Sequence, residues 1–404
     1  MRKIAWSLIA VMIVATLVAL LCHAPSSAAQ PAADGKRVVA ADNDFGLRLF
    51  AQLAKSGNGG NIFISPTSIA LALQMTYNGA AGSTRRAMAK ALGIDELTLD
   101  TLNQENLALL TEAQSPNLGI ELNIANSLWA NQGEHFKPAF LQRVKKYYQA
   151  EVTSLKLASA APRINGWVSD KTQKKITQLV TPDDLQAAVM VLLNAVYFKG
   201  SWQQPFDKKL TADGDFTRAD GKKTTLPMMH LSEGFSYLAT ATFQAIRLPY
   251  AKGQTSFVIL LPKPGFNLKA LEKTLTAANW DKWMNQFSYQ QVDLTLPRFK
   301  VEYRTELGDP LSKLGMGEAF SPKANFTEMS DGRLFINKVI HKSILEVHET
   351  GTEAAAATAV IMTRGAMMPR EKISMTVNHP FLCAIRNDKT GQLLFLGAIE
   401  KPTK

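Results

Sequence analysis

The pattern of apolar and polar residues divides the chain into a helix-rich first half and a strand-rich second half. From Asp42, apolar side chains recur at helical spacing, with Phe45, Leu49, Phe50 and Leu53 on one face. A cap at Thr67 or Ser68 is expected to start a helix that runs to Met75. The same reading predicts helices at 83–92, 98–114, 138–149 and 162–179, and strands at 61–65, 119–130 and 190–198.

Beyond residue 210 the pattern is mainly that of strands. They are expected at 224–230, 235–239, 243–249, 255–261, 291–299, 334–347, 373–377, 381–386 and 393–398, with helices at 267–275, 278–286 and 305–314. No linker, internal repeat or low-complexity tract marks a domain boundary. Interleaved helices and strands without such a boundary indicate a single α+β domain, over residues 42–402.

An alanine-rich stretch near the C-terminus, residues 349–361, carries one charge between Thr350 and Met362, that of Glu353. As a strand it would present two faces, because alternate side chains point in opposite directions. The uncharged face would hold Thr352, Ala354, Ala356, Thr358, Val360 and Met362, with Glu353 on the other. Such a segment could enter a sheet without burying a charge. An alanine-rich helix is the alternative that composition leaves open.

The N-terminus has the three parts of a secretory signal peptide. Arg2 and Lys3 precede an apolar run from Ile4 to Leu21, and a small-residue cleavage region follows. Residues 1–29 are therefore expected to direct export to an extracellular or periplasmic location, with residues 30–41 as a flexible lead. The apolar run is also just long enough to span a bilayer, so an uncleaved membrane anchor is the alternative.

Composition changes the picture in two ways. Without residues 1–29, Cys383 is the only cysteine, so no intramolecular disulfide can form and the core must supply the stability. The remaining 43 Lys and Arg against 34 Asp and Glu give a net charge of +9, spread along the chain. Aromatic residues do not alternate with these basic residues as specific nucleic-acid binding would require. Weak polyanion binding is the alternative to a simply solvated basic surface.

Known catalytic and metal-binding patterns are absent from the sequence. There is no phosphate-binding glycine loop, no metal spacing among the six histidines, and no Gly-x-Ser-x-Gly elbow. The sequence therefore predicts no metal, no cofactor and no enzymatic activity. A serine hydrolase built on Ser65 is kept as a remote alternative.

Several motifs, in family order, resemble those of the serpins, and together they span residues 42–402. They include NIFISPTSIA at 61–70, MTYNGAAGST at 75–84, NAVYFKGSW at 194–202, NHPF at 378–381 and GAIEKP at 397–402. The shorter matches are Leu248–Tyr250, Leu296–Lys300, and His341–Lys342 followed by Glu346–Val347. The resemblance and the signal peptide together suggest an exported serpin of bacterial type.

This resemblance implies a serpin fold: three β-sheets, about eight or nine helices, and an exposed C-terminal reactive loop at about 349–372. It also implies a suicide substrate, in which a serine protease attacks the loop and forms an acyl-enzyme. The cut loop then inserts into the central sheet and the protease is trapped. The chain is expected to act as a monomer. A non-inhibitory serpin, acting as a binding, carrier or chaperone protein, is the alternative.

The family pattern assigns roles to particular residues of this chain. It implies a loop hinge, a polar "shutter" cluster under the central strands, and a "breach" at the top of the sheet where the loop enters. The hinge would be Glu349, Gly351, Thr352, Glu353, Ala354, Ala355, Ala356, Ala357 and Thr358. The shutter would be Ser65, Ser68, Asn194 and His341, and the breach Trp202.

The bond to be cut depends on one residue of register. Seventeen residues counted from Glu349 place the cut between Gly365 and Ala366, which suits an elastase-like or subtilisin-like protease. A hinge one residue shorter places it between Arg364 and Gly365. Arg364 is the only basic residue between Thr350 and Pro369, and trypsin-like proteases require one. A cut at Met367 or Met368, suited to a chymotrypsin-like protease, is a third alternative. The favoured reactive bond is Arg364–Gly365, and the favoured partner is a trypsin-like serine protease.

Overall fold

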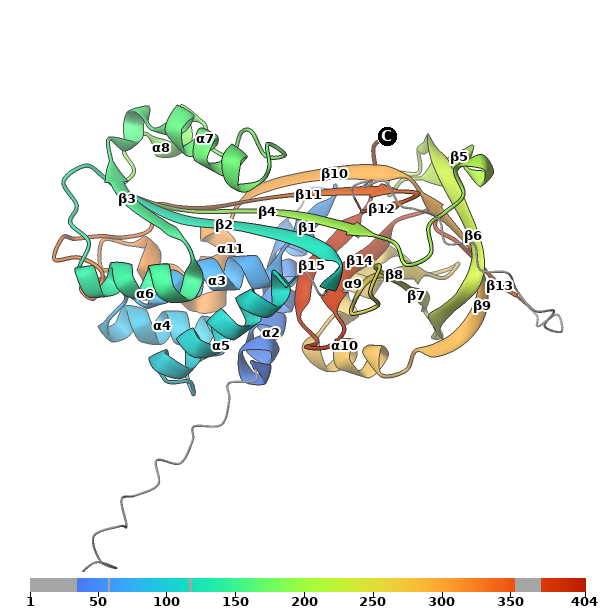
Figure 1. Cartoon of the computed structure of the whole chain (residues 1–404), viewed down its shortest axis with the longest axis horizontal. Helices are drawn as coiled ribbons and strands as arrows, with labels where there is room; N and C mark the ends of the chain where they lie inside the picture. The colour runs from blue at the N-terminus through green and yellow to red at the C-terminus, as the bar shows by residue number, and fades with distance from the viewer. Residues whose placement is uncertain (1–34, 57–58, 116–117, 353–371) are drawn as a thin grey trace, which may run out of the picture. The chain divides into compact units, whose positions relative to one another are not determined.

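The computed structural model describes residues 35–56, 59–115, 118–352 and 372–404 (Figure 1). Residues 1–29, which were expected to be a signal peptide, and residues 353–371 lie outside this part of the chain. None of the helices in the described ranges is long and apolar enough to cross a membrane.

Ten α-helices occur in the described residues, slightly more than the eight or nine expected. They are α2 (Lys36–Ser56), α3 (Pro66–Tyr77), α4 (Gly82–Leu92), α5 (Leu99–Ala113), α6 (Pro138–Tyr148), α7 (Ala161–Lys171), α8 (Pro182–Leu185), α9 (Leu268–Thr274), α10 (Ala277–Met284) and α11 (Gly308–Leu311). The higher number arises because α8 and α11 are single turns of four residues.

The strands form two hydrogen-bonded sheets. The larger has nine strands and contains β1 (Ile62–Ile64), β5 (Ala212–Thr217), β6 (Lys223–Ala239), β7 (Phe243–Pro249), β8 (Thr255–Pro262), β9 (Ser288–Pro297), β13 (Ile373–Thr376), β14 (Phe381–Asn387) and β15 (Leu393–Ile399). The six-stranded sheet has the order β10 (Phe299–Glu306), β11 (Lys338–His348), β12 (Gly351–Thr352), β4 (Met190–Ser201), β2 (Ile120–Asn131) and β3 (Glu151–Leu155). The expected third sheet is not separate, because β6 pairs with β5, β9 and β7 along its 17 residues.

The six-stranded sheet is covered on both faces (Figure 1). Helix α7 and the short α8 lie over one face, and α3 to α6 lie on the other side. Apolar residues of α7, among them Ile164 and Val168, pack with Leu193 of β4 and Ile340 of β11. A strand buried on both faces reads as a nearly continuous apolar run, which explains the strongly apolar sequence that predicted β4.

Over most of its length, β4 has one antiparallel and one parallel neighbour. It pairs with β2 in antiparallel register from Met190 to Gly200. On its other side it pairs in parallel with β11, from Val191 opposite Lys338 to Tyr197 opposite Ile344. Parallel pairing is slightly less stable per residue. This β4–β11 pairing, together with its continuation around β12, is called the seam below.

Several predicted element boundaries were wrong for local reasons. The lead is not flexible from Lys36 onward: α2 starts there, and Val38 and Val39 are buried in the core. Helix α3 is capped by Ser65, whose hydroxyl accepts from the Ser68 amide, because Pro66 already occupies the first helical position. The helix expected at 162–179 ends at Lys171, where two residues with positive φ follow.

In the strand-rich half, the errors concern where strands join and end. Strands 224–230 and 235–239 are one continuous strand, β6. The segment expected to be helical from 305 begins as the end of β10, which pairs with β11 as far as Glu306. Three strands were not predicted: β3, β5 and most of β10. These strands contain polar residues on their exposed faces, so their apolar signal is weak.

Candidate functional site

The upper end of the seam is occupied by the chain itself. After β11 the chain turns at Glu349 and Thr350, and Gly351 and Thr352 then form β12. Strand β12 is antiparallel to both neighbours, with Thr352 opposite Val347 of β11 and Gly200 of β4. The first two residues beyond the turn therefore already lie between the two strands.

Two glycines make room for this arrangement. A Cβ at Gly351 would lie 2.1 Å from the Gly200 carbonyl oxygen, so no other residue fits there. A Cβ at Gly200 would lie 2.7 Å from the Tyr250 ring. The family resemblance placed Gly351 in the hinge, and the structure gives a steric reason for a glycine there, the close approach of two backbones.

Thr352 is 1 % exposed and faces an aromatic group beneath the sheet. Its hydroxyl shares a 2.6 Å hydrogen bond with that of the buried Tyr250. The Tyr250 ring stacks on Trp202, with centroids 4.7 Å apart and ring planes 15° apart. The Trp202 indole N–H in turn donates to the His348 carbonyl oxygen at 2.9 Å. Residues from three separate segments thus fix the upper end of the seam.

The turn before β12 is anchored by Glu349, which is 3 % exposed. Its carboxylate accepts from the Thr211 hydroxyl at 3.1 Å and pairs with the Arg298 guanidinium at 3.4 Å. Its carbonyl oxygen accepts from the Phe206 amide, and that of Thr350 accepts from the Trp202 amide. Residues Glu349 to Thr352 are called the hinge below, since they connect β11 to the segment outside the described residues.

Below the hinge, a buried polar cluster crosses the seam. Asn194 of β4 lies opposite His341 of β11, and its amide oxygen is 2.5 Å from His341 Nδ1. The Asn194 amide nitrogen donates to the Ser68 hydroxyl and to Asn126 Oδ1, both at 2.5 Å, and to the Ser68 carbonyl oxygen at 3.1 Å. One side chain thus links β4 to β11, β2 and α3.

The polarity of this cluster fixes the charge state of His341. Nε2 of His341 accepts from the Ser65 amide at 3.4 Å, so Nδ1 carries the proton and donates to Asn194. Burial lowers the pKa of His341 to about 3. The imidazole is therefore neutral at physiological pH. The Ser65 hydroxyl donates to the Leu394 carbonyl oxygen at 2.6 Å instead of to His341, which is not the arrangement of a nucleophile and its base.

The structure brings together all four residues of the expected shutter and places Trp202 beside the described part of the hinge. The rest of the expected loop hinge and the candidate reactive bonds lie outside the described residues. These are Glu353, Ala354, Ala355, Ala356, Ala357 and Thr358 for the loop hinge, and Arg364, Gly365 and Ala366 for the reactive bonds. Sequence reasoning did not assign Asn126, Gly200 and Tyr250 to the site. Tyr250 belonged to one of the quoted motifs, but only the fold brings it under Thr352.

Metal and thiol chemistry find no support in the part of the chain that the structure describes. No three His, Cys, Asp or Glu side chains come together there as metal ligands would. Cys383 is fully buried, and burial raises the pKa of its thiol well above the usual range.

The central parallel pairing of the six-stranded sheet is thus parted at one end by the chain's own hinge. The family model of serpins, serine protease inhibitors, matches residues 40–402. Pig leukocyte elastase inhibitor is 36% identical over 381 residues, covering 91% of this chain and all of that protein. The chain therefore belongs to the serpin family.

Solved structures agree with this assignment. The native thermophilic serpin tengpin has a TM-score of 0.82 and 32% identity, covering 90% of this chain and 94% of tengpin. Human thyroxine-binding globulin in complex with its ligand has a TM-score of 0.85 and 28% identity, covering 92% of this chain and all of the globulin chain. The serpin fold and its α+β class are confirmed. Because serpins are protease inhibitors and not enzymes, the Ser65 hydrolase alternative is dropped.

Proposed function

We propose that the protein is an exported suicide inhibitor of serine proteases that traps its target by inserting the cleaved reactive loop between β4 and β11. The observation that carries this proposal is β12. Gly351 and Thr352 already pair with both strands, and Thr352 faces the core. Continuing this strand downward would bury Ala354, Ala356 and Thr358 on the Thr352 side, and none of them is charged or large.

The proposed chemistry uses the protease's own catalytic residues. The protease serine attacks the carbonyl carbon of the reactive bond and the C–N bond breaks. The C-terminal fragment leaves with a new, protonated α-amino group, and the rest of the chain remains attached to the protease as an acyl-enzyme ester. Insertion of the loop then carries the attached protease along the sheet and distorts its catalytic site, so that the ester is not hydrolysed. Backbone hydrogen bonding along two strands supplies the driving force.

A trypsin-like protease is the favoured target, with the cut between Arg364 and Gly365. An elastase-like or subtilisin-like protease, cutting between Gly365 and Ala366, is the second choice. One relative bears the name leukocyte elastase inhibitor, so an elastase belongs in the test panel.

The central experiment mixes the purified mature chain with trypsin-like, elastase-like and subtilisin-like proteases and separates the products on a denaturing gel. A covalent complex that survives denaturation is expected with at least one of them. Mass spectrometry of the released C-terminal fragment then identifies the bond. The variant Arg364→Gln should lose complex formation with trypsin-like proteases, whereas the matched variant Arg370→Gln should keep it.

The contrary outcome is cleavage of the loop by active proteases with no covalent complex in any case. Thermal unfolding before and after cleavage then separates two explanations. A large rise in the midpoint shows insertion without trapping, and no rise supports a non-inhibitory binding or carrier serpin. Thyroxine-binding globulin, a structural neighbour whose name describes ligand binding, illustrates that second class.

Export is also part of the proposal, and its support is the charge and hydropathy pattern of residues 1–29. Expression of the full chain followed by N-terminal sequencing tests it. A mature N-terminus near residue 30 in the medium or periplasm is expected. An intact N-terminus in the membrane fraction would instead support the anchor.

A further inference from the structure

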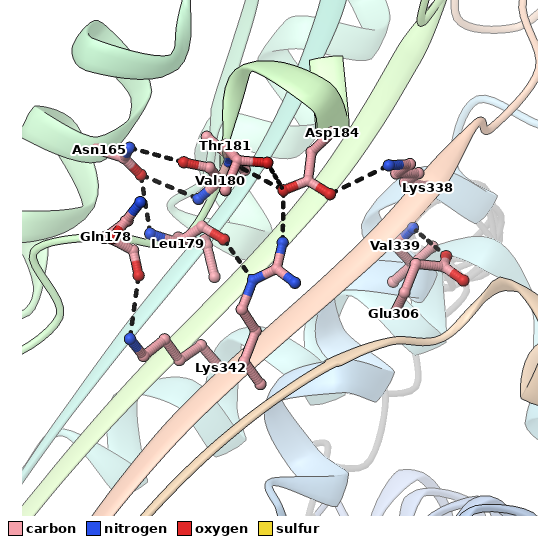
Figure 2. A network of polar contacts seen from close by, with 11 residues as sticks. Asn165, Gln178, Leu179, Val180, Thr181, Asp184, Glu306, Lys338, Val339 and Lys342 are labelled. Atoms are coloured by element: carbon pink, nitrogen blue, oxygen red, sulfur yellow. Dashed lines mark hydrogen bonds and ion pairs between the residues drawn. The ribbon is translucent and has the colours of Figure 1, made fainter. Parts of the chain in front are cut away.

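The segment between α7 and β4, residues 172–189, crosses the seam and is held down by side chains of β10 and β11. This segment is called the connector below. Asp184 of the connector lies 2.5 Å from Arg304 of β10 and 3.1 Å from Lys338 of β11 (Figure 2). The carboxylate therefore joins the chain leading into β4 to both strands on the far side of the seam.

Two further contacts reinforce this attachment. The guanidinium of Arg304 also donates from Nε to the Leu179 carbonyl oxygen at 2.8 Å. Nζ of Lys342, the residue after His341 on β11, donates to the Gln178 carbonyl oxygen at 3.1 Å (Figure 2). Each contact joins the connector to β10 or β11, and none joins it to β4.

On its other side the connector is fixed to α7. Asn165 of α7 accepts from the amides of Leu179 and Val180 and donates to the Val180 carbonyl oxygen (Figure 2). Thr181 and Asp184 form a capping box that starts α8, so the Asp184 carboxylate is held in place before it meets its cationic partners. The connector thus bridges α7 on one side to β10 and β11 on the other.

The Asp184 side chain is only 14% exposed. Burial opposes its ionisation, but the Thr181 amide, the Lys338 ammonium and the Arg304 guanidinium outweigh burial and hold the pKa of Asp184 below its usual range. The carboxylate is therefore charged at neutral pH, and solvent screens its ion pairs less than those of a fully exposed acid.

The connector also contains backbone strain. Gln173 (φ 51°), Lys174 (φ 63°) and Ala187 (φ 59°) are non-glycine residues in the left-handed region. Such conformations persist only where surrounding contacts impose them, and they are common in segments that switch. Three of the four non-glycine residues with positive φ in the described chain lie in this one connector.

Insertion of a strand is not compatible with these contacts. A new strand between β4 and β11 moves them apart by about 4.8 Å, the spacing of neighbouring strands. Met190 starts β4 directly after the connector, whereas Arg304, Lys338 and Lys342 move with the other half of the sheet. Hydrogen bonds of about 3 Å do not survive a displacement of that size.

We propose that Asp184, with Arg304 and Lys338, is a latch that must open before β4 and β11 can part, and that it limits the rate of loop insertion. This inference rests on the insertion mechanism proposed above. Because the latch is made in the native state and lost as the sheet opens, removing it should lower the barrier to opening. The latch would thereby set how often the cut loop inserts before the protease escapes.

The test compares Asp184→Asn with Asp183→Asn in the mature chain. Asp183 is the neighbouring acid in the same short helix, is exposed, and forms no ion pair in the described structure, so both variants remove one charge from α8. The probe is a synthetic peptide of residues 350–363, offered to the uncut protein, and its incorporation is followed by the rise in thermal midpoint. Annealing is expected at least fivefold faster in Asp184→Asn, and within twofold of the unmodified chain in Asp183→Asn.

Equal rates in the two variants, or no annealing by Asp184→Asn, would overturn the latch. Ionic strength provides a second measurement, because salt weakens ion pairs. The annealing rate of the unmodified chain and of Asp183→Asn should rise with NaCl, and that of Asp184→Asn should not. Should Asp184→Asn fold poorly, Arg304→Gln replaces it, since it breaks two of the same contacts and leaves Lys338 paired.

The two proposals fail in different ways. If annealing depends on the latch but no protease of the panel forms a covalent complex, only the proposal of protease trapping is contradicted. If a covalent complex forms but Asp184→Asn and Asp183→Asn anneal the peptide at equal rates, only the latch proposal is contradicted.

Discussion

The two ends of the seam are closed by different means. At the upper end, β4 and β11 are already separated by β12, and Thr352, Tyr250 and Trp202 fill the space below it. At the lower end the two strands pair directly, and Asn194, His341 and the Asp184 latch cross between them. In the proposed mechanism, the first arrangement resembles the product of insertion and the second opposes it.

Under the proposed insertion mechanism, this difference places the barrier to insertion at the lower end of the seam. At the upper end the glycine contacts and the aromatic stack are already formed. Gly351 and Thr352 also already pair with both neighbouring strands, β4 and β11. The remaining barrier is confined to the lower seam, where parallel backbone pairing and buried polar contacts must be exchanged for new ones. Substitutions at the two ends should therefore differ in kind: upper changes should block insertion, and lower changes should promote opening or destabilise the sheet.

The largest effect is expected for Thr352→Arg. A guanidinium at this position would have to be buried against Tyr250 and Trp202 without a counterion, so β12 would be excluded from the seam. The number of inhibitor molecules consumed per trapped protease should rise at least tenfold, with cleaved chain as the main product on a denaturing gel. Thr352→Ser is the control, because it keeps the hydroxyl contact with Tyr250 and should inhibit normally. Full inhibition by Thr352→Arg would contradict the proposal that the upper end starts insertion.

At the lower end, Asn194→Ala should cause the largest loss of stability. The substitution leaves His341 Nδ1, the Ser68 hydroxyl and Asn126 without their shared partner inside the core. Buried unsatisfied groups of this kind destabilise by about 1–3 kcal/mol each, so for three groups a total of at least about 3 kcal/mol is expected. Urea unfolding monitored by circular dichroism measures the loss. Asn123→Ala on the neighbouring strand β2, which removes a contact with Glu121, should change stability by less than about 0.5 kcal/mol.

The sequence was sufficient for the outline of this seam. The strongly apolar sequence of β4 predicted a strand that the structure contains, and the motif residues Ser65, Ser68, Asn194 and His341 do form one cluster. Of the alternating stretch after Glu349, the described residues reach only to Thr352, which lies in β12. Strand period and burial depend on neighbours in the sequence, so a pattern can reveal them.

Contacts between distant segments could not be predicted. Tyr250 lies about 100 residues from Thr352, and Asp184 lies 120 residues from Arg304, so no local pattern links them. The helix expected at 162–179 failed for a related reason. Polar contacts with β10 and β11 impose a strained connector on residues whose composition favours a helix. Tertiary contacts override local preference at the place where we propose a switch.

The pH dependence of the lower seam follows from His341. The folded pKa of about 3 lies below the ordinary value of 6.5, so between these values the unfolded chain binds a proton that the folded chain does not. His341 therefore stabilises the fold fully above pH 6.5, and this contribution is lost as the pH falls toward 3.

His341→Gln should accordingly reduce stability at pH 7 but weaken its dependence on pH between 6.5 and 4, by up to about 1.4 kcal/mol per pH unit. Urea midpoints measured across this range test the prediction. His135→Gln, at an exposed histidine outside the seam, is the control and should keep the slope of the unmodified chain. The same slope in His341→Gln would mean that the imidazole is not neutral in the folded protein.

The smallest effect is expected at the upper end, for Trp202→Phe. A phenyl ring can still stack on Tyr250, but it cannot donate to the His348 carbonyl oxygen. The loss of one hydrogen bond and part of the stack should reduce stability by about 1 kcal/mol. Trp167→Phe on α7, which loses an edge contact with Trp129 and lies away from the hinge, is the matched control. Since His348 immediately precedes the hinge, only Trp202→Phe should also change the rate of peptide annealing. A change of the same size in both variants would show that the upper end is held by general core packing and that the indole contact has no special part in starting insertion.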